Sequence, residues 1–327
     1  MKDAGVKFKL SALILAGLMV LASQVFGAAR IINGTEVTES TQDDSYPWIT
    51  ALMINGSASC GASLIADQWV LTAAHCVTDE DTGSPMSASN FTVVVNDYDL
   101  RLQGDGESHT VTEVYVADGF DITTLDGDIA VLKLSSTVTS TPITLMSSSD
   151  FNALADNTAL KVMGWGNVSI SEDIYPNILR EVDVNYANFS TCQEQYGAIG
   201  ASVTSNMFCA GGDGETDSCQ GDSGGPIMQL VNGEYQQVGI VSSGGTEEQS
   251  CAVKDYPGIY TRLSNYHSWI SSVMAGNESP DSRLDGDTSG GDEQTSNSGK
   301  SSGGSLGGGL ILLVLLLSVV RVSRKQT

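Results

Sequence analysis

A glycine-dense hexapeptide, Gly-Asp-Ser-Gly-Gly-Pro at residues 221–226, most constrains what this chain can fold into. Glycine adopts backbone conformations that other residues avoid, so this stretch favours a tight turn. Such a turn exposes the hydroxyl of Ser223 and lets backbone N–H groups converge beside it. The hexapeptide therefore predicts either a nucleophilic serine or a glycine-rich turn in which the serine is incidental.

The base that a serine nucleophile requires narrows these interpretations. The chain has only three histidines, His75, His109 and His267. An α/β-hydrolase, whose Gly-x-Ser-x-Gly turn the hexapeptide also fits, needs a histidine after the serine, and His267 lies in a stretch typical of a surface helix. His75 instead ends an apolar run, and Asp128 opens another. The order His75, Asp128, Ser223 is that of the chymotrypsin group.

With these residues in family order, the chain resembles the trypsin/chymotrypsin family of serine endopeptidases from residue 31 to about residue 275. The resemblance implies an all-β fold of two packed antiparallel six-stranded β-barrels with a C-terminal helix and an active site in the cleft between the barrels. Short apolar or alternating runs and a helical stretch near residues 265–274 agree with that architecture. Further matching segments lie at residues 60–65, 164–166, 207–211 and 257–262.

The resemblance assigns a role to each catalytic residue. Ser223 would attack the scissile carbonyl and form an acyl-enzyme, His75 would take and return the proton, and Asp128 would hold the imidazole. Asp126 is a rival carboxylate, but the Asp-Ile-Ala pattern favours Asp128. Backbone N–H groups of Gly221 and Ser223 would form the oxyanion hole.

Substrate specificity in trypsin-like members depends on the residue six positions before the serine, which is Asp217 here. Its carboxylate would form the floor of the S1 pocket and pair with Arg or Lys at P1, because a carboxylate buried without a cation is costly. Gly244 and Gly258 match the pocket-wall glycines, and Ser242 is assigned to substrate binding with them. Ser243 replaces the tryptophan that the family usually has, which leaves preferences beyond P1 open.

The segment that begins Arg30-Ile31 resembles the activation site of a zymogen. Cleavage after Arg30 would free the amine of Ile31. That cation would turn inward and pair with Asp222, ordering the pocket and the oxyanion hole. Residues 28–30 would then be a short propeptide. The alternative explanation of Arg30 is a basic exit from a signal peptide.

Residues 1–27 combine a basic start, an apolar run and a small-residue exit, which is typical of a secretory signal peptide. The apolar run is short for the alternative, a transmembrane helix. Export implies an oxidising compartment, in which six cysteines are expected to form three disulfides. The spacing required for a zinc site is absent from the sequence. The family resemblance selects the pairs Cys60–Cys76, Cys192–Cys209 and Cys219–Cys251.

The chain is acidic, with 39 Asp and Glu against 15 Lys and Arg and a net charge of −24. Such a surface repels nucleic acid and attracts cationic substrates, although solubility alone also accounts for it. No cofactor or catalytic metal is expected. Some trypsin-like proteins bind calcium in a loop that aligns with residues 97–107. Here Gly104 stands where another carboxylate would help, so calcium is left as an open alternative.

The C-terminal region changes in composition. Residues 276–305 are rich in Gly, Ser, Asp and Asn, which predicts a flexible linker. Residues 306–327 contain an apolar run followed by a basic end. This tail resembles the GlyGly-type sorting segments of Gram-negative exported proteins, which implies removal by a rhomboid-type intramembrane protease. A permanent membrane anchor with a cytoplasmic basic end and a GPI signal are the alternatives.

The sequence therefore predicts an exported trypsin-like serine endopeptidase, secreted or at the cell surface, that cleaves polypeptides after Arg or Lys. It would be made as a zymogen and activated by itself or by another protease. The alternative is a protease-fold binding or adhesion protein without significant catalysis. Proteins of that kind normally lose a triad residue, and all three are present here.

Overall fold

The computed structural model describes residues 31–38, 45–101 and 106–284. The predicted signal peptide, the short propeptide with Arg30, most of the predicted linker and the hydrophobic tail lie outside these residues. Within the described part of the chain, no helix has the length and apolar character needed to cross a membrane.

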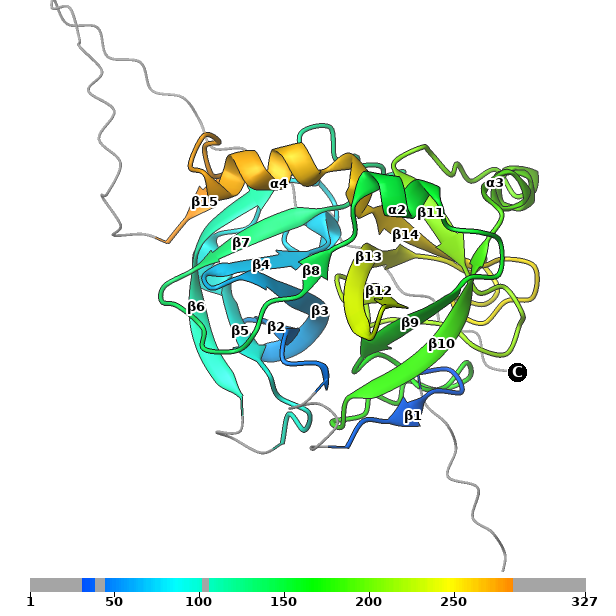
Figure 1. The fold of residues 1–327 in the computed structure, drawn as a ribbon, viewed down its shortest axis with the longest axis horizontal. Helices are drawn as coiled ribbons and strands as arrows, with labels where there is room; N and C mark the ends of the chain where they lie inside the picture. The colour runs from blue at the N-terminus through cyan, green and yellow to red at the C-terminus, as the bar shows by residue number, and fades with distance from the viewer. Residues whose placement is uncertain (1–30, 39–44, 102–105, 285–327) are drawn as a thin grey trace, which may run out of the picture. The chain divides into compact units, whose positions relative to one another are not determined.

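Six antiparallel strands close into an N-terminal barrel (Figure 1). The hydrogen-bonded path runs β6-β5-β2-β3-β4-β7, and the pairing of β6 with β7 closes it. In β5, Phe91, Val93 and Val95 are buried and the residues between them are partly exposed. This alternation directs aromatic and β-branched side chains into the barrel interior. The strands are β2 (Ile49–Ile54), β3 (Ser57–Ala66), β4 (Trp69–Thr72), β5 (Phe91–Val95), β6 (Glu107–Val116) and β7 (Ala130–Leu134).

A second barrel follows, along the path β10-β11-β14-β13-β12-β9, closed by the pairing of β9 with β10. Two short strands attach to it: β1 (Thr35–Glu36) pairs with β10, and β8 (Thr144–Leu145) runs parallel to β13. The predicted fold of two six-stranded antiparallel barrels is confirmed. The barrel strands are β9 (Ala159–Gly164), β10 (Arg180–Ala187), β11 (Met207–Ala210), β12 (Pro226–Val231), β13 (Glu234–Ser243) and β14 (Gly258–Arg262).

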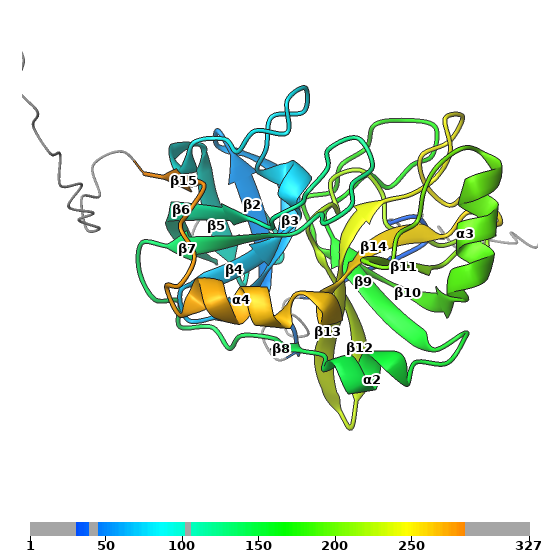
Figure 2. The ribbon, with the colours of Figure 1, turned by 90° about the horizontal axis from the view of Figure 1, so that it is seen from above.

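The predicted C-terminal helix is present as α4 (His267–Met274). It follows the last strand of the C-terminal barrel, but its Ile270 and Val273 pack in the core cluster of the N-terminal barrel, so it crosses from one barrel to the other (Figure 2). The remaining helices of the described residues are α2 (Ser148–Asn152), α3 (Phe189–Ala198) and the 3₁₀ turns η1 (Ala74–Cys76), η2 (Ala88–Asn90) and η3 (Leu263–Asn265).

Three disulfides join the cysteine pairs that the family resemblance selected. Cys60–Cys76 ties β3 to η1, and Cys192–Cys209 ties α3 to β11. Cys219–Cys251 ties the segment before Ser223 to the loop after β13. Two of these bonds adjoin predicted site residues, since Cys76 follows His75 and Cys219 lies two residues after Asp217.

Part of the predicted linker, residues 277–284, belongs to the described residues. Residues 277–284 pack on the N-terminal barrel, where β15 (Ser282–Arg283) pairs antiparallel with β6. The polar composition predicted a flexible segment, but backbone hydrogen bonds to a strand edge do not depend on apolar side chains. The rest of the predicted linker lies outside the described residues.

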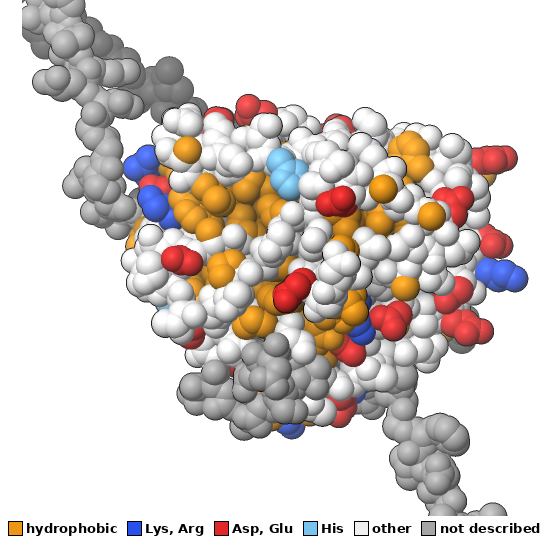
Figure 3. Space-filling model, viewed as in Figure 1, with side chains coloured by type: hydrophobic (Ala, Val, Ile, Leu, Met, Phe, Trp, Pro, Cys, Tyr) orange, Lys and Arg blue, Asp and Glu red, His pale blue; other side chains and the backbone are white. Residues whose placement is uncertain are grey.

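Acidic side chains are scattered over the face of the molecule shown in Figure 3, and basic side chains are few there. This distribution agrees with the net charge of −24. A surface of this kind has a negative potential, which attracts cationic peptides and repels nucleic acid.

Candidate active site

The predicted triad is supplied by three segments from both barrels. His75 lies in η1 directly after β4, and Asp128 lies just before β7, so both belong to the N-terminal barrel. Ser223 lies in the turn between β11 and β12 of the C-terminal barrel. The site thus forms where the two barrels meet.

Asp128 is fully buried and holds His75 at two points. Its Oδ2 lies 2.8 Å from Nδ1 of the imidazole, and its Oδ1 accepts the backbone N–H of His75 at 2.9 Å. With the Nδ1 proton donated to the carboxylate, Nε2 is left as the basic nitrogen. Burial by itself lowers the pKa of His75, but the charge and hydrogen bond of Asp128 outweigh it and raise the pKa above its usual value.

The C-terminal barrel also binds Asp128. The hydroxyl of Ser242, on β13, donates to its Oδ2 at 2.5 Å, and the hydroxyl of Thr261, on β14, donates to its backbone carbonyl at 2.6 Å. Ser242 was predicted as a substrate-binding residue, and its hydroxyl also orients the carboxylate of Asp128. Nothing in the sequence signalled the contribution of Thr261.

The residues that were alternatives to this triad have other hydrogen-bond partners. Asp126, the rival carboxylate, accepts hydrogen bonds from Thr204 Oγ1 at 2.5 Å and Asn206 Nδ2 at 3.0 Å. Nε2 of His267 lies 2.8 Å from the carbonyl oxygen of Met146. Asp128 is therefore the carboxylate that contacts a histidine of the site, and the order of groups is not that of an α/β-hydrolase.

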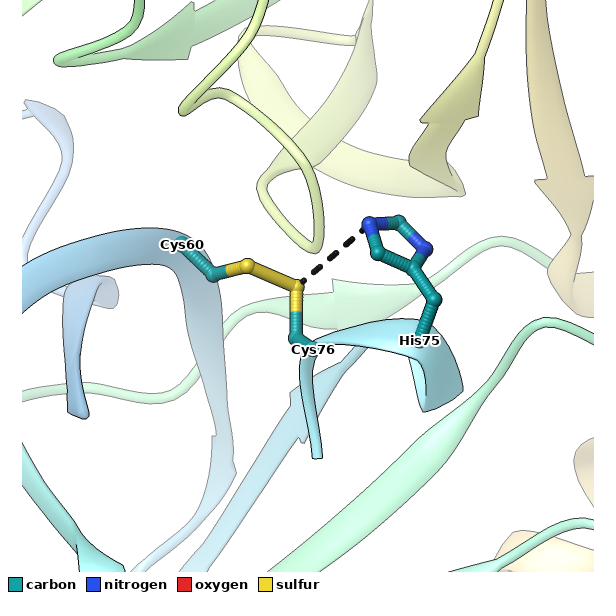
Figure 4. Close-up of side chains that lie close together, drawn as sticks. All are labelled: Cys60, His75 and Cys76. Atoms are coloured by element: carbon teal, nitrogen blue, oxygen red, sulfur yellow. Dashed lines mark hydrogen bonds between the residues drawn. A yellow bond between two sulfur atoms is a disulfide. The ribbon is translucent and has the colours of Figure 1, made fainter. Parts of the chain in front are cut away.

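The Cys60–Cys76 disulfide lies beside the ring of His75 (Figure 4). Nε2 of His75 lies 3.7 Å from Sγ of Cys76, and the same sulfur lies 3.7 Å from the carbonyl oxygen of Ser223. Cys60, His75 and Cys76 are the one group of potential metal ligands close together among the described residues. Because both sulfurs are joined in a disulfide, they carry no thiolate and do not fit a metal ion.

Ser223 is fixed through its backbone. Its carbonyl accepts the N–H of Gly61 at 2.7 Å, and the N–H of Gly224 donates to Val241 at 2.8 Å. Within the described residues, the Ser223 hydroxyl makes no hydrogen bond to the His75 ring. Catalytic hydrogen bonds of this kind commonly tighten only when substrate is bound.

The turn before Ser223 leaves two donors free. Gly221 has a φ of 93°, a conformation that glycine adopts without steric cost. Neither its N–H nor that of Ser223 donates to an acceptor in the described part of the chain. Two unpaired N–H groups on either side of Asp222 are what an oxyanion hole requires.

Asp222, between these two donors, points into the protein. It is fully buried, and its carboxylate accepts the N–H groups of Gly166 at 2.8 Å and Cys219 at 2.9 Å. Burial raises its pKa to about 7, and no cation of the described residues pairs with it. Ile31, the predicted new N-terminus, is also fully buried in the core cluster of the C-terminal barrel.

A cavity of about 230 Å³ opens beside Ser223. Asp217 lies in its wall and is 2% exposed. Its Oδ2 accepts the N–H of Ala252 at 2.8 Å, whereas its Oδ1 is buried without a hydrogen-bond partner. Burial raises the pKa of Asp217 to about 7. The cavity wall therefore includes a buried carboxylate, one oxygen of which has no donor among the described residues.

The other predicted pocket residues lie around this carboxylate. Ser242 and Gly244 line the cavity with Asp217. A Cβ added to Gly258 would lie 3.0 Å from Asp217 Oδ1, and one added to Gly244 would lie 3.2 Å from Gly258. A side chain at either glycine would thus narrow the space above the carboxylate.

The loop that aligns with a calcium site does not fit calcium in its described residues. Asp99 pairs with the guanidinium of Arg101. Glu107 accepts the backbone N–H and the hydroxyl of both Thr139 and Ser140 at 2.7–3.1 Å. These carboxylates already have protein donors, whereas a calcium ion needs their oxygens free. Gly104 lies outside the described residues.

Comparison with known proteins agrees with this geometry. The family model described as Trypsin matches residues 32–270. Trypsin I-P1 of Gallus gallus is 37% identical over 226 residues, covering 68% of this chain and 82% of that protein. Trypsin Blo t 3 of Blomia tropicalis is 38% identical, covering 75% and 86%. Trypsin-3 of Salmo salar is 34% identical, covering 76% and 94%.

Proposed function

The chain belongs to the trypsin family and is a serine endopeptidase, and we propose that it cleaves polypeptides after Arg and Lys. The observation that carries this specificity is the buried carboxylate of Asp217 in the wall of a cavity beside Ser223, whose Oδ1 has no hydrogen-bond partner among the described residues. A guanidinium or ammonium group entering the cavity supplies the missing donor and the compensating charge. A neutral P1 side chain leaves that oxygen unpaired.

The triad geometry supports acyl transfer. As the Ser223 Oγ forms a bond to the scissile carbonyl carbon, its proton passes to Nε2 of His75. Asp128 stabilises the imidazolium through the 2.8 Å contact with Nδ1. The carbonyl oxygen becomes an oxyanion that the N–H groups of Gly221 and Ser223 stabilise. The proton then goes to the leaving amine, and water hydrolyses the acyl-enzyme by the same steps.

A peptide-library cleavage profile tests the specificity. Asp217→Ser should reduce kcat/KM for Arg and Lys substrates by orders of magnitude, because the P1 cation loses its buried partner. Labelling of Ser223 by a fluorophosphonate should persist, since the triad is unchanged. Ser250→Ala, at another position in the cavity wall, is the matched control. A wild-type preference for Phe or Ala at P1 would refute the assignment.

The proposal includes activation by cleavage after Arg30, by the enzyme itself or by another protease. Its support is the pair of buried groups that cleavage would join: Asp222, which lacks a cation, and Ile31, which is already enclosed in the core. Arg30→Gln should give an intact and nearly inactive protein. Ile31→Gly should permit cleavage but weaken activation, because the new N-terminus loses its apolar anchor. Full activity in a protein that still carries residues 28–30 would disprove the activation step.

We also propose that the protein is exported and that its tail, residues 306–327, is a sorting segment removed by an intramembrane protease. The three disulfides support export, because such bonds persist in oxidising compartments. Intact-mass measurement of the mature protein provides the test. An N-terminus at Ile31 and a C-terminus upstream of Leu310 are expected. A retained tail would favour a permanent anchor.

A further inference from the structure

The segment that follows α4 also packs on the N-terminal barrel. Residues 277–284 continue along the N-terminal barrel and finish beside β6, where Figures 1 and 2 both place β15. The N–H of Asp281 donates to the carbonyl of Val114 at 2.9 Å, and the N–H of Leu284 donates to that of Thr112 at 2.8 Å. This segment lies beyond the residues 32–270 that the family model matches.

The edge of β6 has room for this segment because β5 covers only part of it. The pairing between the two strands stops on this side at Thr92 with Thr110, close to Phe91, where β5 begins after the turn η2. The carbonyls of Thr112 and Val114 lie beyond that pair and receive their donors from residues 281–284. Such an uncovered strand edge is a docking site for an extended peptide.

Three side chains of the segment anchor it. Asp281 Oδ2 accepts the N–H of Val116 at 2.8 Å, and Ser282 Oγ accepts the N–H of Ala88 at 2.9 Å. Leu284 packs against the core cluster of the N-terminal barrel. The segment is therefore recognised by side-chain contacts as well as by strand pairing.

The fourth side chain, Arg283, points toward a buried carboxylate. Its Nη1 lies 3.8 Å from Oε1 of Glu113, which is 6% exposed. Glu113 also accepts the hydroxyl of Tyr115 at 2.5 Å and pairs with Lys133 at 3.3 Å. Arg283 itself remains 42% exposed, so the pairing orients the side chain without removing it from solvent.

We propose that residues 277–284, the C-terminal clamp, are an intramolecular strand that completes the edge of β6 and shields the Arg283–Leu284 bond from proteases that cleave after Arg. A protease binds its substrate as an extended segment, so the clamp must first leave β6. Release breaks both backbone bonds and the side-chain contacts of Asp281, Ser282 and Leu284 together. The catalytic domain therefore includes residues 277–284, and trimming of the tail that preserves the clamp occurs after Leu284.

The clamp has a direct consequence for an enzyme that cleaves after Arg. This consequence rests on the proposed specificity, whereas the docking of the clamp on β6 does not depend on that specificity. Hydrolysis of the Arg283–Leu284 bond by another copy would divide the clamp and detach everything that follows. The pairing with β6 keeps that bond out of an active-site cleft. An unprotected Arg283–Leu284 bond would refute the clamp, whereas failure of this enzyme to cleave after Arg would refute only the proposed specificity.

Proteolysis by added trypsin tests the clamp in the full chain carrying Ser223→Ala, which prevents self-cleavage. The triple variant Asp281→Ala, Ser282→Ala, Leu284→Ala should be cut after Arg283 at least about 10-fold faster than the parent. Its Tm should also fall by about 2–4 °C, because the variant loses the contacts that hold the clamp on the N-terminal barrel. The control, Ser279→Ala, changes an exposed residue and should match the parent. Equal rates for the triple variant and the parent would overturn the proposal.

Hydrogen exchange provides a measurement that does not depend on folding of the variant. In the parent chain, the amides of Val116, Ala88 and Leu284 should exchange slowly, because each donates to an acceptor across the clamp interface. The amide of Ser279, which has no acceptor within the described residues, should exchange rapidly. Rapid exchange at Leu284 and Val116 in the parent would mean that the clamp does not dock.

Discussion

The uncleaved precursor should lose stability as pH rises from about 4 to about 7, because Asp222 is buried without a cation. Its pKa is raised by burial from 3.8 to about 7. Between these values the folded chain holds a proton that the unfolded chain has released, so the free energy of unfolding decreases with pH and levels off above pH 7. A shift of about three pKa units corresponds to about 4 kcal/mol, which is the upper limit of the effect.

Urea unfolding of the Arg30→Gln precursor at pH 4.5 to 8 measures this loss. Asp217 contributes a change of the same sign, since burial raises its pKa to about 7 as well. The measurement is therefore made in an Asp217→Asn background, with and without Asp222→Asn. Only the slope of the free energy of unfolding against pH is compared. Its absolute value also changes, because the side-chain amide introduced by Asp222→Asn cannot accept both N–H groups that the carboxylate accepts.

The mature protein supplies the second comparison. There the amine of Ile31 is expected to pair with Asp222, which keeps the carboxylate ionised and removes the loss between pH 4 and 7. If the precursor and its Asp222→Asn variant show the same slope, Asp222 does not titrate in this range. If the precursor and the mature protein show the same slope, the amine does not reach it.

Three further predictions concern catalysis. Ser242→Ala should lower kcat/KM by about 10- to 100-fold, because a hydrogen bond to a charged group is worth about 1.5–3 kcal/mol. The control, Ser243→Ala, should change kcat/KM little. Equal losses in the two variants would refute a role of Ser242 through Asp128. The kcat/KM of the wild type should rise with pH through a pKa above the usual value for histidine, since the neutral ring of His75 is the base. Asp128→Asn should lower that pKa. An unshifted profile in the variant would contradict the pairing of His75 with Asp128. Addition of a calcium chelator should leave Tm unchanged, and a fall would show a site that the described carboxylates do not reveal.

The catalytic centre was predictable from the sequence because its groups lie in short, dense motifs. The glycines around Ser223 and the apolar strands next to His75 and Asp128 identify both the residues and their order. The contact between Asp128 and His75 follows from that order and is present at 2.8 Å. The pairing of the three disulfides was predicted from the family resemblance, because the spacing of the cysteines alone allows other pairings.

Other features were invisible because they depend on tertiary contacts. The hydroxyl of Ser242 turns toward Asp128 only because β13 passes beside the segment before β7. Helix α3 has a weak apolar pattern, and its one local signal is Asn188, whose side chain accepts the N–H of Thr191. Residues 277–284 look like a linker because strand pairing uses backbone atoms, which composition does not report.

The two hydroxyls that bind Asp128 also set when activity first becomes available during synthesis. His75 and Asp128 emerge early from the ribosome, but Ser242 and Thr261 lie far later in the chain. A nascent polypeptide therefore carries no complete catalytic centre until most of its catalytic domain has been translated. Ser223 also lies in the C-terminal barrel, so the N-terminal half of the growing chain holds His75 and Asp128 without a nucleophile.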